Sequence, residues 1–232
     1  MMNTPQRIDL HTHSFLSDGE LLASEMLRRA AVLGYGALAI TDHADASNLA
    51  LVIEALRRVL REQPADFGTR LLVGVELTHV APESIDRLAR QAKALGAEIV
   101  VVHGETIVEP VAPGTNRAAI ASPAVDILAH PGFLTVEEAR SAAARGCYVE
   151  ITSRKGHSLT NGHVARICQA AGASMVVDTD THAPGDMITL DMAQQVAAGA
   201  GLSPEEVWAA TVTHPQEIVA RVLRARQREG WA

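Results

Sequence analysis

Two patterns of apolar and polar residues alternate along most of this chain. The first consists of short β-branched and aliphatic runs, which predict seven strands at 7–10, 37–41, 71–77, 98–102, 125–129, 148–152 and 174–178. The second has apolar residues at helical spacing and predicts helices at 21–33, 49–61, 84–95, 136–144 and 163–171. Several of these helices end next to a glycine, which most easily adopts the left-handed conformation beyond a helix C-terminus: Gly34, Gly96, Gly146 and Gly172.

Strands that alternate with helices in this way indicate a parallel α/β fold, because parallel neighbours need a crossover connection. An open doubly wound sheet gives the same alternation, so the periodicity alone does not close the sheet into a barrel. The chain has 232 residues and no linker rich in Pro, Gly or Ser. An α/β barrel of this length commonly forms a single domain, so we expect one domain over residues 1–232.

Two parts of the chain depart from this regular alternation. The stretch 104–116, with the sequence GETIVEPVAPGTN, is predicted to be a long loop that covers a site. The C-terminal part, about 189–228, is expected to be helical. Within it, residues 204–228 are predicted to form one or two surface helices broken near Pro215.

Composition narrows the possible classes of function. The net charge is −7 and no long run of Lys and Arg is present, which argues against binding of long nucleic acid. Aromatic residues make up only 3% of the chain, so stacking platforms for single strands are scarce as well. No signal-peptide pattern and no membrane-spanning apolar stretch is present, so we expect a soluble, cytoplasmic protein without a membrane partner. Cys147 and Cys168 form no CxxC pair and are expected to be buried thiols.

Histidines and carboxylates gather where six of the seven predicted strands end. Nine residues share this position: His11, His13 and Asp18 after the first strand, His43, Glu76, His103 and His130 at the next four, and Asp180 and His182 after the last. In a barrel, the C-terminal ends of the strands converge and their loops share one rim, where active sites lie. A single histidine there would usually be a hydrogen-bonded loop residue, but nine such residues at corresponding positions predict a metal site.

The spacing within this set indicates how the ligands are presented. HTH at 11–13 and DTH at 180–182 place two metal-binding side chains two residues apart, and on an extended strand both point the same way. The set contains imidazole and carboxylate groups without thiolate. Such ligands suit zinc, manganese or iron in an open site rather than a structural zinc cage.

The order of these motifs resembles that of the PHP (polymerase and histidinol phosphatase) family. DLHTHSFLSDG is followed by TDH, GVEL, His103, AHPG and DTDTH, and together they span residues 9–182. HxH alone would also suit an amidohydrolase, whereas HxH with SDG and TDH is similar to the PHP pattern. The resemblance implies a distorted (β/α)7 barrel, similar to a TIM barrel, and a trinuclear metal centre.

The resemblance also implies which residues hold each metal. The first metal would be held by His11, His13, Glu76 and Asp180. Glu76 would bridge to a second metal held by His103 and His130. The third metal would be held by Asp18, His43 and His182. Some family members have a histidine where this chain has Asp18, so the metal preference of the third site stays open.

Two or three divalent cations on these ligands would support hydrolysis of a phosphoester. Paired metals about 3.5–4 Å apart can hold a bridging hydroxide in line with phosphorus and stabilise the departing oxygen, so no nucleophilic Ser or Cys is required. Three cations bring +6, and Asp18, Glu76 and Asp180 bring −3, which leaves +3. The site can therefore attract an anionic substrate although the whole chain is acidic. The leaving group would be protonated by a metal-bound water or by a nearby histidine.

Residues after the predicted sixth strand are candidates for substrate binding. Arg154 and Lys155 follow it in ITSRKGH, and a guanidinium there could clamp a phosphate through two parallel hydrogen bonds. A solvated loop charge is the alternative for both residues. His157 is a further candidate for the lining of the pocket. His79 is interpreted as an ordinary loop residue, and Glu109 as either a contact for a cationic substrate group or a solvated charge.

These observations favour hydrolysis of a small phosphomonoester, and the resemblance makes histidinol phosphate one candidate substrate. Relatives with an SDG motif make phosphodiesterase or exonuclease activity on short oligonucleotides a second hypothesis. A non-catalytic metal-binding regulatory module is a third, although such a module would not need all nine ligands. The sequence leaves the physiological substrate, the identity of the metals and the oligomeric state open.

Overall fold

The computed structural model describes residues 5–62 and 67–228, and within them seven parallel strands form a nearly closed barrel. The strands, in their spatial order, are β1 (Arg7–Asp9), β2 (Tyr35–Ile40), β4 (Arg70–Leu77), β5 (Ile99–His103), β6 (Ile127–Ala129), β7 (Tyr148–Thr152) and β8 (Met175–Asp178). The last strand meets the first through a parallel bridge between Thr12 and Thr181, just beyond the ends of both strands. The predicted distorted (β/α)7 barrel is therefore confirmed.

All seven predicted strands are present, with ends displaced by at most two residues. An additional strand, β3 (His43–Ala44), was not predicted, because two residues are too few to produce an alternating pattern. β3 pairs with β4, and its register places His43 beside Glu76. Two predicted metal ligands are thus brought together by strand pairing.

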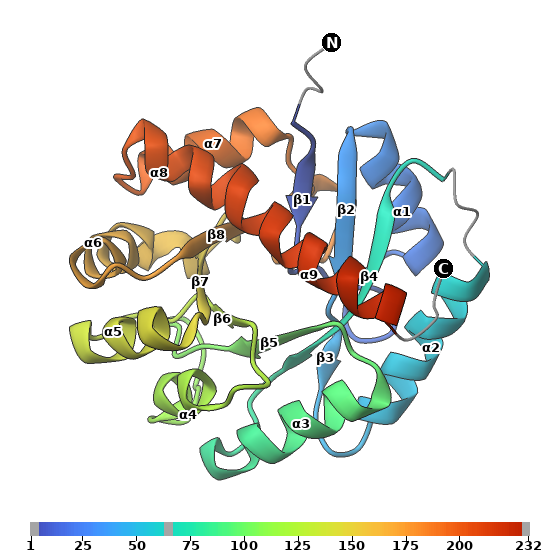
Figure 1. Cartoon of the computed structure of the whole chain (residues 1–232), viewed down its shortest axis with the longest axis horizontal. Helices are drawn as coiled ribbons and strands as arrows, with labels where there is room; N and C mark the ends of the chain where they lie inside the picture. Colours follow the sequence, from blue (N-terminus) through green and yellow to red (C-terminus); the bar gives the residue numbers. More distant parts are fainter. Residues whose placement is uncertain (1–4, 63–66, 229–232) are drawn as a thin grey trace.

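Helices connect the strands around the outside of the barrel (Figure 1). The predicted helices correspond to α1 (Ala23–Val32), α2 (Leu49–Glu62), α3 (Ile85–Leu95), α5 (Val136–Arg145) and α6 (Asn161–Ala171). α7 (Leu190–Gly199) lies in the C-terminal part that was expected to be helical, whereas α4 (Thr115–Ala121) is additional. Short 3-10 turns occur at Pro82–Ser84, His157–Thr160 and Pro184–Asp186. Local sequence fixes the ends of α5, because Thr135 and Glu138 form a capping box and Gly146 ends the helix with φ 73°. The predicted long loop is irregular as far as Gly114, since α4 begins at the next residue.

Aliphatic residues fill both sides of the sheet. In β2, Leu38 and Ile40 belong to a large apolar cluster shared with the surrounding helices. Ala37 and Ala39 belong to a smaller cluster inside the barrel. This division follows from the two-residue period of a strand, whose successive side chains point to opposite faces. Among the described residues, no helix is long and apolar enough to cross a membrane.

The C-terminal segment differs from its prediction. α8 (Pro204–Trp208) continues through a π-helical turn, Ala209–Thr213, into α9 (His214–Arg228). Pro215 has no N–H to donate to the preceding turn, and the π turn that changes the hydrogen-bonding pattern ends two residues before it. The predicted break near Pro215 is therefore present as a π turn between two α-helices, and not as a loop.

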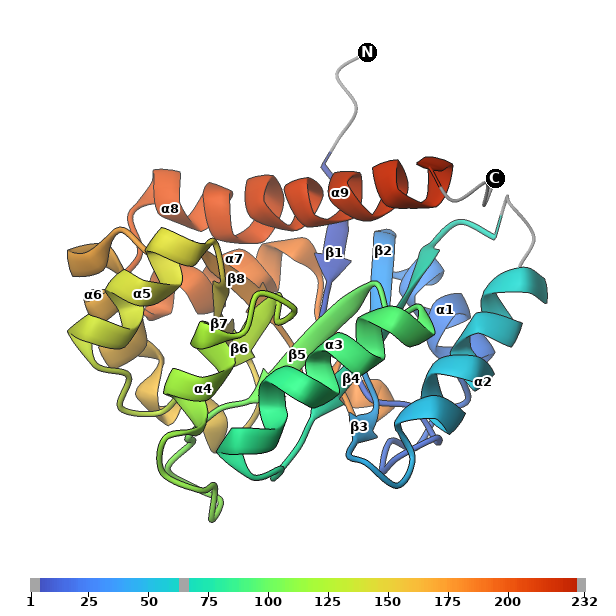
Figure 2. The same cartoon turned by 60° about the horizontal axis from the view of Figure 1, so that its bottom comes forward.

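α9 closes one end of the barrel instead of lying on its surface as predicted. Its residues Ile218, Val219 and Val222 are buried in the same apolar cluster as the residues inside the barrel, such as Ile99 and Val101. Figure 2 shows α9 lying across the ends at which the strands begin. The opposite end, where the strands finish, is left open for the loops that carry the histidines.

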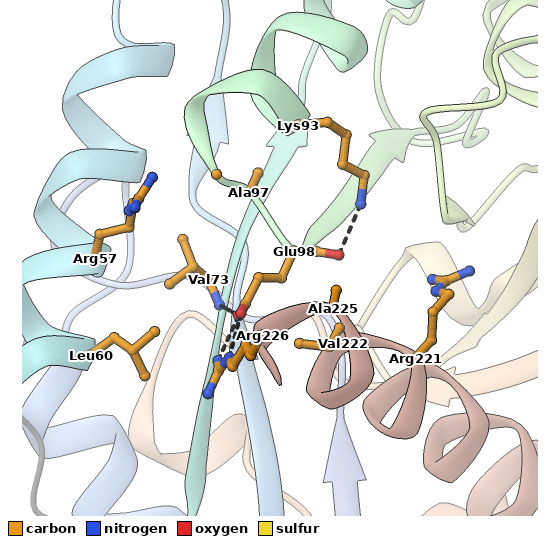
Figure 3. A pocket seen from close by; sticks show the side chains of 11 residues that line it. Arg57, Leu60, Val73, Lys93, Ala97, Glu98, Arg221, Val222, Ala225 and Arg226 are labelled. Carbon is orange, nitrogen blue, oxygen red and sulfur yellow. Dashed lines mark hydrogen bonds and ion pairs between the residues drawn. The ribbon is translucent and has the colours of Figure 1, made fainter. Parts of the chain in front are cut away.

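Ion pairs hold α9 against the barrel around a cavity of about 340 Å³ (Figure 3). Glu98, directly before β5, accepts a hydrogen bond of 2.7 Å from Arg226 of α9. Asp126 accepts hydrogen bonds of 2.6 Å from both Arg221 of α9 and Lys93 of α3. These three cations are therefore paired, and their contacts join α9 to the strand starts, far from the C-terminal strand ends.

Candidate metal centre

The structure brings all nine predicted metal ligands together at the C-terminal ends of the strands. They fall into overlapping groups, within each of which the ligand nitrogen and oxygen atoms lie within 4.8 Å of one another. These groups are His11, His13 and Asp180; His11, Glu76 and His130; His13, Asp18, His43 and His182; and His103, His130 and His157. Six of the nine side chains are buried, and so many buried ionisable groups require charged or hydrogen-bonded partners.

The first group is presented by the ends of β1 and β8. His11 and His13 follow β1, and their Nε2 atoms lie 3.1 Å apart. His13 Nε2 lies 3.0 Å from Asp180 Oδ1, and His11 Nε2 lies 3.3 Å from Glu76 Oε1. Asp180 has φ 52°, a left-handed conformation that is unfavourable for a residue other than glycine and is often found at functional sites. These four residues are the predicted ligands of the first metal.

A second group forms around the carboxylate of Asp18, which the loop after β1 carries. Asp18 Oδ1 lies 3.3 Å from His43 Nε2, and Asp18 Oδ2 lies 3.2 Å from His182 Nε2. The ring centroid of His13 lies 4.3 Å from those of His43 and His182, which are 5.8 Å apart, so the three rings form a triangle. The loop itself is held by Asp42, which accepts hydrogen bonds from the backbone and side chain of the preceding HTHS motif. This group contains the predicted ligands of the third metal.

A third group lies where β5, β6 and β7 end. The rings of His103 and His130 have centroids 4.5 Å apart, and the ring of His157 stacks on His130 at 4.2 Å. His103 and His130 are predicted ligands of the second metal, whereas the sequence suggested His157 only as part of the pocket lining. The structure therefore adds a third imidazole to this group.

Glu76, near the end of β4, lies between all three groups. Its Oε1 lies 3.3 Å from His11 Nε2 and 3.8 Å from His130 Nε2, whereas its Oε2 lies 2.8 Å from His43 Nδ1. The two oxygens thus face different groups. This arrangement suits a carboxylate that bridges two cations.

The polar atoms of the cluster fit bound cations. Glu76 Oε1 and both ring nitrogens of His130 are fully buried and make no hydrogen bond to any other part of the described chain. Buried polar atoms are normally paired, so each such exception requires an explanation. A divalent cation would satisfy them, because carboxylate oxygen and imidazole nitrogen are its usual ligands.

The charges of the ligands also suit cations. Burial raises the pKa of Glu76, but the neighbouring charges of His11 and His103 outweigh it and hold the pKa of Glu76 well below its usual range. Burial and the nearby charge of His103 hold the pKa of His130 well below its usual value. Glu76 and His130 therefore favour the states that bind metal, an ionised carboxylate and a neutral imidazole. Burial lowers the pKa of His11 and of His103, but neighbouring carboxylates outweigh it and raise both, so these two rings would release a proton when metal binds.

Glu150 is a functional residue that the sequence analysis missed. It lies in the middle of β7 and is fully buried, and its Oε2 lies 2.6 Å from His11 Nδ1. A carboxylate at this nitrogen orients the ring and leaves Nε2 to face the cluster. The signal in the sequence was a charged residue within the short buried strand YVEIT. The alternation of apolar and polar residues along a strand does not show which side chain of another strand will contact such a residue.

The predicted substrate-binding residues divide into two kinds. Arg154 is half-buried, with Nε 3.8 Å from Asp180 Oδ2, and its Nη1 donates a hydrogen bond of 3.0 Å to Asp186. Asp186 thus fixes the guanidinium at the edge of the cluster. Lys155 is exposed and has no ion-pair partner among the described residues, as expected for a solvated loop charge.

His79 and Glu109, both in loops, lie closer to the cluster than was expected from the sequence. Glu109 lies 3.0 Å from His103 Nε2 and 3.1 Å from His79 Nε2, both measured from Oε2. Glu105, in the same loop, has a structural role, since its Oε1 accepts hydrogen bonds from the backbone of Gly114 and Asn116. Only tertiary contacts distinguish these two glutamates.

Comparisons with known proteins agree with this geometry. Residues 9–120 match the PHP domain. An uncharacterized protein of Methanocaldococcus jannaschii is 49% identical over 218 residues, which cover 93% of this chain and 100% of that protein. Ribonuclease P protein component 3 of Methanosarcina mazei is 28% identical over 158 residues, which cover 66% of this chain and 59% of that protein. The structure of histidinol phosphate phosphatase from Lactococcus lactis, complexed with zinc, L-histidinol and phosphate, has the same fold, with a TM-score of 0.60, 14% identity and coverage of 85% of this chain and 95% of that one.

Proposed function

This chain belongs to the PHP domain family, and on that basis we propose that it is a metal-dependent phosphoesterase that hydrolyses a small phosphomonoester. The observation that supports this most directly is the cluster of nine histidines and carboxylates with Glu76 at its centre. Histidinol phosphate is one candidate substrate, since a histidinol phosphate phosphatase shares the fold.

The cluster would hold two or three divalent cations of zinc, manganese or iron. The proposed ligands of the first cation are His11, His13, Glu76 and Asp180. Those of the second are Glu76, His103 and His130. Those of the third are Asp18, His43 and His182. The position of Glu76 supports its role as the bridge, because its Oε1 lies near both His11 of the first set and His130 of the second.

When bound, the cations would activate water for attack on phosphorus and neutralise the negative charge on the phosphoryl oxygens. The protein's own residues would bind and orient the ester. The Arg154 guanidinium lies beside Asp180 and is fixed by Asp186, so its remaining N–H groups are available for a phosphate oxygen. With three cations the charge at the site is +6 − 3 = +3, counting the carboxylates of Asp18, Glu76 and Asp180. Such a site attracts a dianion within an acidic protein.

A second candidate function is a non-catalytic role in an assembly with RNA. A relative named as a protein component of ribonuclease P favours it. The net charge of −7 argues against direct binding of long RNA, and nine retained metal-type side chains exceed what a scaffold requires. Hydrolysis of a nucleotide phosphodiester is a third candidate, because the same metal chemistry acts on diesters.

The proposed function is tested by turnover with the metal-loaded protein. Manganese-, zinc- and iron-loaded samples are assayed against an aryl phosphate, its bis-aryl diester, histidinol phosphate and short oligonucleotides. We expect turnover of monoesters ahead of diesters. Preference for the diester or the oligonucleotide would favour the phosphodiesterase, and no turnover by fully loaded protein would favour the non-catalytic role.

Glu76→Gln is the matched control for these assays. Gln keeps the size of the side chain but removes the charge and one acceptor oxygen. We expect the variant to lose metal from two sites together and to lose turnover, with an unchanged circular dichroism spectrum. His43→Ala should instead empty mainly the third site. Full metal content and near-normal turnover of Glu76→Gln would show that Glu76 is not a bridge.

A further inference from the structure

The carboxylate of Glu109 lies among three histidines that come from three different strands. Its Oε2 lies 3.0 Å from Nε2 of His103, at the end of β5, and 3.1 Å from Nε2 of His79, after β4. Its Oε1 lies 3.4 Å from Nε2 of His157, after β7. Both oxygens of a loop carboxylate are thus engaged by ring nitrogens, although the side chain is 38% exposed.

The hydrogen bonding of His103 makes this contact unfavourable unless a positive charge lies within it. His103 Nδ1 lies 3.2 Å from the carbonyl oxygen of Gly104, which can only accept a hydrogen bond, so Nδ1 carries a proton. In a neutral ring, Nε2 then presents a lone pair toward Glu109 Oε2. Two acceptor atoms at 3.0 Å repel each other, so a proton or a cation must lie between them.

The three rings lie close enough to one another to share one cation. The ring centroids of His79 and His103 are 5.0 Å apart, and those of His103 and His157 are 5.8 Å apart. One divalent cation would accept lone pairs from neutral rings and from the carboxylate at the same time.

The distances also match the edges of a coordination sphere. Zinc binds imidazole nitrogen and carboxylate oxygen at about 2.0–2.2 Å, which separates neighbouring ligands by roughly 2.9–3.5 Å in octahedral or tetrahedral geometry. The three nitrogen–oxygen separations around Glu109 are 3.0, 3.1 and 3.4 Å. Both His103 and Glu109 belong to a group of potential ligand atoms with His79, and His103 belongs to another with His130 and His157.

The loop that carries Glu109 is held at its base and lies close to the β7 loop near its tip. Glu105 Oε1 accepts hydrogen bonds from the backbone N–H groups of Gly114 and Asn116, which closes the base of the loop. Near its tip, Val108 lies 3.5 Å from the position that a Cβ would take on Gly156, the residue before His157. These contacts hold Glu109 over the β5, β6 and β7 ends.

We infer that Glu109 is a further ligand of the metal centre, carried by this loop, and that with His79 and His103 it completes a site for a divalent transition metal. This inference rests on the proposed function, because it assumes that the cluster binds metal. Glu109 would also lower the net charge at the site from +3 to +2. It would therefore strengthen metal binding and weaken the attraction of the site for an anion.

The test compares the wild type with Glu109→Gln and with a matched control, Glu137→Gln. Glu137 lies exposed on α5 and loses the same charge without touching the cluster. Zinc affinity is measured by competition with a chromophoric chelator, and the coordination environment by the visible spectrum of the cobalt-loaded protein. For Glu109→Gln we expect about 10–100-fold weaker binding of one metal equivalent and an altered cobalt spectrum. We expect Glu137→Gln to match the wild type.

Two results would overturn the inference, and they differ from a failure of the proposed function. If the wild type binds metal and Glu109→Gln binds it with the same affinity and the same cobalt spectrum, Glu109 is not a ligand. If Glu137→Gln weakens binding as much as Glu109→Gln does, the effect is one of general charge. A wild type that binds less than one metal per chain would instead refute the proposed function itself.

Discussion

Among the residues that contact a proposed metal ligand without binding metal themselves, Glu150 gives the most informative substitution, Glu150→Gln. Glu150 is fully buried in β7, and its Oε2 lies 2.6 Å from His11 Nδ1. Gln has the same shape, and its side-chain oxygen can still accept a hydrogen bond from the ring, but it carries no charge. The substitution therefore keeps the orientation of His11 and removes only the negative charge behind it.

The magnitude follows from the position of this charge. A carboxylate behind a ligating imidazole increases the electron donation of the ring, and loss of such a partner weakens metal binding by about 10–100-fold. This corresponds to about 1.4–2.7 kcal/mol of binding free energy. Burial raises the pKa of Glu150, although the charge of His11 opposes the rise, so the neutral Gln should be tolerated by the folded apoprotein.

Asp178→Asn is the matched control. Asp178 is a fully buried carboxyl group on the neighbouring strand β8, and its Oδ1 accepts a hydrogen bond from the backbone of Leu10. Burial and the charge of Asp9 hold the pKa of Asp178 well above its usual range. The amide of Asn keeps an oxygen that can accept the bond from Leu10, so Asp178→Asn should leave metal binding unchanged.

The assay is competition for zinc with a chelator of known affinity, and thermal unfolding of the apoprotein serves as the folding control. We expect Glu150→Gln to lower the affinity of the tightest site while the unfolding temperature of the apoprotein changes little. If Glu150→Gln binds zinc with the wild-type affinity, the charge of Glu150 does not strengthen metal binding by His11. An equal loss in Asp178→Asn would show that barrel packing, and not the charge behind His11, controls the affinity.

Arg154, α9 and the two cysteines give further predictions. Arg154→Ala should raise KM for a phosphomonoester about 10–150-fold at unchanged metal content, because a hydrogen bond to a charged group contributes about 1.5–3 kcal/mol; unchanged kinetics would make Arg154 a solvated loop charge. Ile218→Ala should lower the free energy of unfolding in urea by about 2–5 kcal/mol, because it removes buried contacts between α9 and the barrel, and a loss below about 0.5 kcal/mol would contradict this packing. Burial raises the pKa of Cys147 to about 11 and that of Cys168 to about 12, so both thiols should remain protonated at pH 8 and react with a thiol reagent only after unfolding. Rapid labelling of the folded protein would contradict their burial.

The local pattern of the sequence was sufficient for the barrel and for most of the cluster. Strands buried on both faces appear as aliphatic runs, and glycines mark the helix ends, so all seven main strands were predicted to within two residues. The spacing of His11 and His13 already indicated that both rings point the same way. A parallel barrel brings its strand ends to one rim, so residues that follow the strands were bound to lie together.

Three features were decided only by tertiary structure. Strand register placed His43 beside Glu76, through a two-residue strand that is too short to predict from an alternating pattern. Packing of α9 against the residues inside the barrel closed the end opposite the site, although one or two surface helices had been predicted for this segment. Glu150 and Glu109 became partners of histidines that are distant in the sequence.

The physical reason is the range over which each kind of information acts. Side-chain periodicity and capping depend on residues within one turn or one strand, so the sequence determined which elements form and which way their side chains point. The partner of a buried carboxylate depends on the register of neighbouring strands and on how a loop closes over them. Those arrangements are fixed by contacts between segments many residues apart, and only the folded barrel brings such segments within the 2.6 Å that separates Glu150 from His11.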